Sequence, residues 1–307
     1  MQCRRILTAA AAALLLCASA EAASGKVRVR QKIKGFELPR YENGTLIWKV
    51  VCDSAEILDT KEVRLRSPKL HVVPAKDKPG YDISARSGLV SSDRKTIQLS
   101  NTVRTVSTNG DTLETESMKW DTASETAFSD SPIQIKRGKM RLSGVGLTAK
   151  AKERNFRIHK KAGLVMTRDK FRPGQKGLVT VASEGSLTFK DGLAVFAGRS
   201  SVTSDTGTTT SDKLDLHIDM KTETVRKVVA TGNVTFASDD MTGTCRAAEW
   251  DPASDTVELS GKVDLKDMKN GNTVQSEHAR ITAGNRRMSC PGPATLTVYP
   301  RKMKAAE

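Results

Sequence analysis

The sequence predicts an all-β protein built from stacked antiparallel strand repeats, and two observations predict this fold. The phrase WDTASETA, which begins at Trp120, returns in altered form as WDPASDTV at Trp250. Short apolar–polar alternations surround both copies, and no segment beyond the first two dozen residues holds a helical period. Self-similarity of this kind is typical of repeat architectures, in which each unit buries its apolar face against its neighbours.

A second repeated phrase marks the individual units. It joins a small residue, a polar or basic residue and Val, as in LSNTV, TGNV and SGKV, with a looser copy GRSSV. The glycines of the last three copies, Gly198, Gly232 and Gly261, lie 34 and 29 residues apart. That spacing fits two strands and two turns per unit.

The composition favours many half-exposed strands over a thick core. The chain has 307 residues, of which 37% are hydrophobic and only 4% aromatic. This length suffices for one large or two ordinary domains. We therefore expect a thin apolar core between extended strands.

The first 22 residues predict a secretory signal peptide. Arg4 and Arg5 precede an apolar stretch, Ile6–Cys17, and small residues at Ala20 and Ala22 offer two cleavage sites. An uncleaved anchor stays open as the alternative, although about 20 apolar residues are needed to span a bilayer. Export to the periplasm follows in either case, with tethering to the inner membrane if cleavage does not occur.

Removal of this segment leaves three cysteines, Cys52, Cys245 and Cys290. An odd number allows at most one intramolecular disulfide. Cys245 and Cys290 are the favoured pair because both fall in the second half of the chain, and three unpaired cysteines are the open alternative.

Strands are predicted in order along the chain. The first, Lys26–Lys34, alternates apolar and basic residues and so has a basic outer face. Further strands are expected at Leu46–Val51, Val63–Arg66, Leu70–Val73, Thr96–Val103 and Ile133–Ile135. Turns are expected at Asn43-Gly44, Pro79-Gly80, Asn109-Gly110 and Ser131-Pro132.

A cluster of Pro, Gly and charge at Phe171–Gly177 predicts a boundary between two related blocks, residues 23–172 and 177–299. The second block contains the cleanest alternation, KLDLHIDM, beginning at Lys213. A last strand is expected at Thr295–Tyr299, followed by a disordered tail at 300–307.

Positive charge gathers in the middle of the chain, whose net charge is +15. Between residues 136 and 176 only Glu153 and Asp169 are acidic. The basic residues there are Lys136, Arg137, Lys139, Arg141, Lys150, Lys152, Arg154, Arg157, Lys160, Lys161, Arg168, Lys170, Arg172 and Lys176. This zone predicts contact with an anionic partner, such as lipid phosphate or an acidic protein surface, with a solvated face as the alternative.

No catalytic or metal motif emerges. The four histidines have no metal-ligand spacing, and neither a P-loop nor a nucleophile elbow occurs. We therefore expect no enzyme activity and no metal or other cofactor. Nucleic acid is not an expected partner either, because only Phe156 and Phe171 could supply stacking faces in the basic zone.

The apolar side of the alternating strands is the candidate binding surface. Its members are aliphatic or slender, so two curved sheets are expected to close over it incompletely and leave a trough for acyl chains. A filled sandwich core is the alternative. The candidate lipid-binding residues are Leu99, Val103, Trp120, Leu214, Leu216, Ile218, Val234, Phe236, Trp250, Leu259 and Val263.

Several phrases resemble a known family. ATGNVTF at Ala230, LSGKVDL at Leu259 and the Trp250 phrase resemble the OstA-like domain of lipopolysaccharide transport, LptA. In the first block, GTLIWKVVCDSAEI at Gly44 and QLSNTVRTVSTNGDTLETESMKWD at Gln98 are similar to LptC, as is SDSPIQIKRG further on.

The resemblance implies a twisted, open β-jellyroll shaped like a half-pipe, which shields acyl chains of lipopolysaccharide during periplasmic transport. It implies edge-strand pairing with an inner-membrane ABC transporter complex and other bridge proteins, and a head-to-tail homo-oligomer is a further option. Two features depart from the family: LptC relatives usually keep a membrane anchor, and fusion of both blocks is unusual. A structural β-solenoid scaffold or adhesin-like exported protein is the alternative function.

Overall fold

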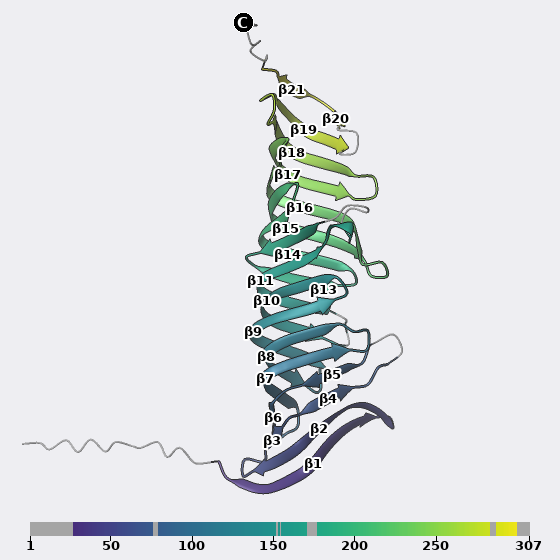
Figure 1. The fold of residues 1–307 in the computed structure, drawn as a ribbon, viewed down its shortest axis with the longest axis vertical. Coiled ribbons are helices and arrows are strands. Elements are labelled where there is room, and N and C mark those ends of the chain that lie inside the picture. The colour runs from purple at the N-terminus through teal and green to yellow at the C-terminus, as the bar shows by residue number, and fades with distance from the viewer. Residues whose placement is uncertain are drawn as a thin grey trace, which may run out of the picture.

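The computed structural model describes residues 27–75, 79–151, 153, 155–170, 177–282 and 287–299. Its strands form one 21-stranded antiparallel sheet that stacks along the long axis of the molecule (Figure 1). β1 (Val29–Glu42) lies at one end, and β20 (Arg287–Ser289) and β21 (Ala294–Thr297) lie at the other. A 3-10 turn, η1 (Arg168–Lys170), is the helical element of the described residues. The predicted all-β jellyroll is confirmed, and the sheet runs on through both predicted blocks.

The strands β2 to β19 lie between these ends. They are β2 (Thr45–Leu58), β3 (Val63–Arg66), β4 (Lys69–Val72), β5 (Tyr81–Ser84), β6 (Ser87–Val90), β7 (Thr96–Ser107), β8 (Thr112–Asp121), β9 (Thr126–Arg137), β10 (Met140–Lys150), β11 (Asn155–Thr167), β12 (Leu178–Ser183), β13 (Ser186–Lys190), β14 (Leu193–Ser204), β15 (Gly207–Asp219), β16 (Thr224–Ala237), β17 (Met241–Asp251), β18 (Thr256–Asp267) and β19 (Thr273–Thr282).

The repeated phrase of the sequence is where the long strands bend. Positive φ angles occur at Asn101 and Thr102 in β7, Gly198 in β14, Gly232 in β16 and Gly261 in β18. The pairing register shifts at the same places, as a β-bulge requires. Gly and Asn tolerate this left-handed backbone better than other residues, so the phrase encodes a bend rather than a turn.

Each bend divides the sheet into two walls. In several layers the bend is a complete break. For example, β13 pairs with Asn155–Ile158 of β11, and β12 pairs with Gly163–Thr167 of the same strand. Wall A comprises the short strands β3, β6, β13 and β20, together with the halves of the long strands (their arms) that pair in register with them. Wall B comprises β4, β5, β12 and β21 with their arms. The turns at the free ends of the walls form lip A and lip B.

Three turns of lip A share one design. Asp121, Asp219 and Asp251 each accept hydrogen bonds from backbone amides two or three residues further on, and the fourth residue after each has a positive φ. These bonds hold the pKa of each carboxyl below its usual range, to about 2 for Asp219. Two of these turns follow the tryptophan copies that the sequence shows. The third, IDMKTETV, begins at Ile218 and has Ile in place of Trp, so the repeated phrase did not predict it.

One predicted turn is wrong. Ser131 and Pro132 lie inside β9, where the pairing of β9 with β10 shifts between Val145 and Leu147. Proline has no N–H to donate, and a bulge is the part of a strand that tolerates this loss. The predicted signal peptide, the block boundary at 171–176 and the tail at 300–307 lie outside the described residues.

Candidate functional site

Apolar side chains from both walls fill the space between them. One cluster extends from Trp48 to Ala127, and a larger one extends from Ile133 to Ala279. Leu113 packs against both clusters, so the two are contiguous. The molecule therefore has an apolar interior along nearly its whole length.

The eleven candidate lipid-binding residues all belong to this interior. Leu99, Val103 and Trp120 lie in the first cluster. The second cluster contains the rest: Leu214, Leu216, Ile218, Val234, Leu259 and Val263 are buried, and Phe236 and Trp250 are partly buried. The alternation in the sequence thus identified the inward side correctly. That these side chains contact lipid stays a prediction.

The interior differs from the expected open trough. Leu214 and Leu216 are 1% and 0% exposed. The space around them is filled by larger side chains that the sequence analysis did not include, among them Met166, Leu187 and Phe196. The alternating run LAVFAG around Phe196 was the signal that could have found them.

The interior loosens toward the C-terminal end. Ala230, Ala248 and Ala279 occupy inward positions on β16, β17 and β19, where the middle of the molecule has larger residues. Trp250 is only partly buried there, and Leu296 on the last strand is 63% exposed. Small side chains leave apolar area uncovered, so this end is the more accessible part of the lining.

The two lips touch near the middle of the molecule. Arg137, at the end of β9 on lip B, places its Nε 3.9 Å from Oε1 of Glu223 on lip A. The same Nε lies 4.0 Å from Oδ2 of Asp111 on lip B. Burial raises the pKa of Asp111; Arg137 opposes this shift and Glu223 adds to it. An ion-pair cluster thus bridges the mouth between the walls.

The three cysteines of the described chain are free. Burial raises the pKa of the Cys245 thiol to about 11 and also raises that of Cys52. Cys290 packs against the second apolar cluster. The favoured pairing of Cys245 with Cys290 is therefore not formed, and the alternative of unpaired cysteines applies.

Within the described ranges, three or more His, Cys, Asp or Glu side chains nowhere converge as a metal site would require. In the same ranges, no helix has the length and apolar character to cross a bilayer.

A long antiparallel sheet, bent into two walls around a continuous apolar interior, defines an elongated β-jellyroll. Two protein families match the chain. Residues 23–165 match the family described as lipopolysaccharide-assembly, LptC-related, and residues 180–284 match the LptA/(LptD N-terminal domain) LPS transport proteins. The chain belongs to the LptA and LptC superfamily of lipopolysaccharide-transport proteins.

Among solved structures, the chain is similar to LptH from Pseudomonas aeruginosa, described as the LptA homologous periplasmic component of the lipopolysaccharide transport device. The two are 16% identical with a TM-score of 0.36, and the match covers 40% of this chain and 95% of LptH. A comparison with curated protein sequences gave no match.

Proposed function

We propose that this chain is a segment of a periplasmic bridge that carries lipopolysaccharide from the inner toward the outer membrane. Acyl chains lie against the inward side chains of the two walls, and the phosphorylated sugars stay outside. The observation that carries this proposal is the continuous apolar interior, whose C-terminal end is only partly covered. Membership of the superfamily agrees with it.

Loading requires the walls to separate, because the middle of the interior is filled. Each CH₂ group that leaves water for an apolar site gains about 0.8 kcal/mol. An acyl chain replaces side-chain contacts that the walls already make, so the net gain per group is smaller. Sites of similar affinity along the interior would let an external motor push lipid from one to the next.

Both ends of the sheet suit pairing with neighbours. Within the described chain, β1 pairs with β2 alone, and β20 and β21 pair with β19 alone. An edge strand with unpaired N–H and C=O groups accepts a further strand. The inner-membrane transporter complex, another bridge protein or a second copy of this chain would join there. The chain would work in the periplasm, either free or tethered by residues 1–22.

Photo-crosslinking by position tests this proposal. Crosslinkers at the inward positions Leu216, Val234 and Trp250 should capture glycolipid, and those at the outward positions Lys213 and Asp215 should not. Each variant is checked for folding by circular dichroism, and native mass spectrometry identifies the lipid. Capture from the outward positions alone would refute binding between the walls.

A further inference from the structure

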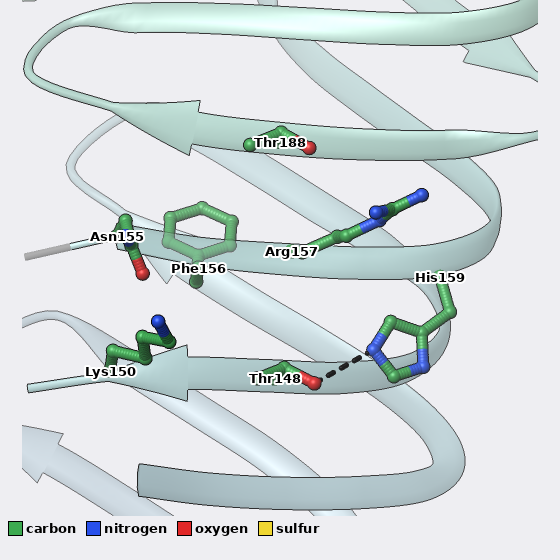
Figure 2. A pocket seen from close by; sticks show the side chains of 7 residues that line it. All are labelled: Thr148, Lys150, Asn155, Phe156, Arg157, His159 and Thr188. Carbon is green, nitrogen blue, oxygen red and sulfur yellow. Dashed lines mark hydrogen bonds between the residues drawn. The ribbon is translucent and has the colours of Figure 1, made fainter. Parts of the chain in front are cut away.

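A cavity of about 430 Å³ lies on the outer face of wall A, next to the turn that joins β10 to β11 (Figure 2). Thr148 of β10 is opposite Arg157 of β11, and Arg157 is opposite Thr188 of β13. Their neighbours Leu147 and Ile158 are buried in the interior. Because side chains alternate along a strand, the three polar residues form one outward row across three strands.

Positive charge exceeds negative charge in this cavity. Lys150 and Arg157 line it. Glu153 is the nearby acidic residue, and its carboxylate is engaged elsewhere. It accepts hydrogen bonds from Lys150 at 2.9 Å and from Asn155 at 2.8 Å. Within the described chain, Arg157 has no carboxylate partner, and its guanidinium donates one hydrogen bond, to Ser186 Oγ at 3.3 Å. A guanidinium without a carboxylate partner is available to an incoming anion.

The remaining lining is held in place. His159 Nε2 lies 2.9 Å from Thr148 Oγ1, as the dashed line in Figure 2 marks. The ring of His159 lies over Gly146, where an added Cβ would come within 2.7 Å of Nδ1. Phe156 stacks on Phe189 with ring centroids 5.2 Å apart. Both rings pack against the second apolar cluster, so they support the strands from the inner side, while fixed polar groups face outward.

We propose that this cavity, which we call the lip A site, binds a phosphorylated sugar. Arg157 and Lys150 would hold the phosphate by charge-assisted hydrogen bonds. Thr148, Thr188 and the Asn155 amide would hold sugar hydroxyls.

This inference rests on the proposed function, and it assigns a place on the protein to the phosphorylated head group of the lipid. Lys150 and Asn155 flank the β10–β11 turn, which belongs to lip A. A lipid whose acyl chains pass between the lips must leave its head group outside the mouth. The outer side of lip A is then within reach of the phosphates. This accounts for part of the basic zone, since Lys150 and Arg157 belong to it.

The test compares two arginine variants of the full chain. Arg157→Gln removes the guanidinium of the lip A site. Arg280→Gln is the matched control, because Arg280 lies in the same outward row, on β19, and its guanidinium pairs with Glu258 at 2.6 Å. The probes are an acylated disaccharide carrying phosphates, the same lipid without phosphates, and glucose 1-phosphate.

Arg157→Gln should weaken binding of the phosphorylated lipid on the order of tenfold, the effect of losing one hydrogen bond to a charged group. Binding of the lipid without phosphates should not change, and Arg280→Gln should change neither. Displacement by glucose 1-phosphate would show that the site also takes the free sugar phosphate, and no displacement would assign it to lipid head groups. If both lipids bind the wild type equally and Arg157→Gln has no effect, the lip A site is refuted while lipid carriage stands. If neither lipid binds the wild type, the proposed function fails.

Discussion

The two tryptophan turns have nearly the same sequence and lie in regions of different packing. Trp120 closes β8 and is 4% exposed, and its buried Nε1 has no hydrogen-bond partner among the described residues. Trp250 closes β17, is only partly buried, and its Nε1 donates to Asp255 Oδ1 at 3.4 Å. The same phrase therefore sets the same turn in both places, while the surrounding side chains decide how tightly the indole is enclosed.

This difference separates two tasks along one interior. Around Trp120, side chains fill the space between the walls and stabilise the fold. Around Trp250, inward alanines such as Ala230 and Ala248 leave the indole partly uncovered. A lipid carrier needs both a stable frame and a lining that hydrocarbon can reach. We expect substitutions in the two regions to separate these properties.

The largest expected effect is at Trp120. Trp120→Ala should lower the free energy of unfolding by about 3 to 5 kcal/mol, because a buried aromatic leaves a cavity. Trp250→Ala should cost clearly less stability and weaken lipid binding instead. Urea unfolding followed by circular dichroism measures both. Trp120→Phe is the control: it should cost less than Trp120→Ala because it keeps a ring and removes the buried N–H. Equal losses for the two alanine variants would contradict the comparison.

A smaller effect is expected where the strands bend. Gly232→Val should lower the unfolding free energy by about 1 to 3 kcal/mol, since its φ is +77° and an added Cβ would lie 2.5 Å from Asp212 Oδ2. Asn101→Gly, at the corresponding bend of β7, should be tolerated, because φ there is +64° and glycine adopts it without strain. Thermal unfolding of the two variants tests whether the repeated phrase encodes the bend. A harmless Gly232→Val would show that it does not.

The contact between the lips should affect loading more than stability. Arg137→Gln removes the ion pair that bridges the mouth. Its side chains are partly exposed to solvent, and ion pairs near the surface contribute about 0 to 1 kcal/mol. We expect faster uptake of a fluorescent lipid in stopped-flow measurements, with little change in the urea midpoint. Lys269→Gln is the matched control, since its ion pair with Asp240 joins residues of the same lip. Equal uptake rates for both variants would mean that the bridge does not limit opening.

The smallest effect is a loss of stability in acid. The folded-state pKa of Asp219 is about 2, below its ordinary value of 3.8, so its turn bonds stabilise the fold above pH 3.8. That contribution is lost as the pH falls from 3.8 toward 2, when the carboxylate is protonated. The melting temperature should decline over this range, and Asp219→Asn should reduce the decline. An identical pH profile in the variant would refute this role of the turn.

The sequence predicted most of the fold because the repeats carry local rules. Alternation located inward residues such as Leu216, and the phrases around Gly232 and Gly261 marked units that the structure resolves as bends. The packing of the interior could not be predicted in the same way. It depends on which side chains of wall A contact those of wall B, and the order of the strands does not specify these contacts. The contact of Arg137 with Glu223, 86 positions apart, is of this long-range kind.

Quenching of Trp250 by brominated acyl chains tests most directly whether lipid occupies the space between the walls. Bromine quenches an indole only at close range, and a variant with Trp48 and Trp120 replaced by Phe leaves Trp250 as the single reporter. We predict quenching on addition of brominated glycolipid and none with a brominated soluble alcohol at equal bromine concentration. Unchanged Trp250 fluorescence in the presence of bound lipid would contradict the account, because the acyl chains would then lie elsewhere.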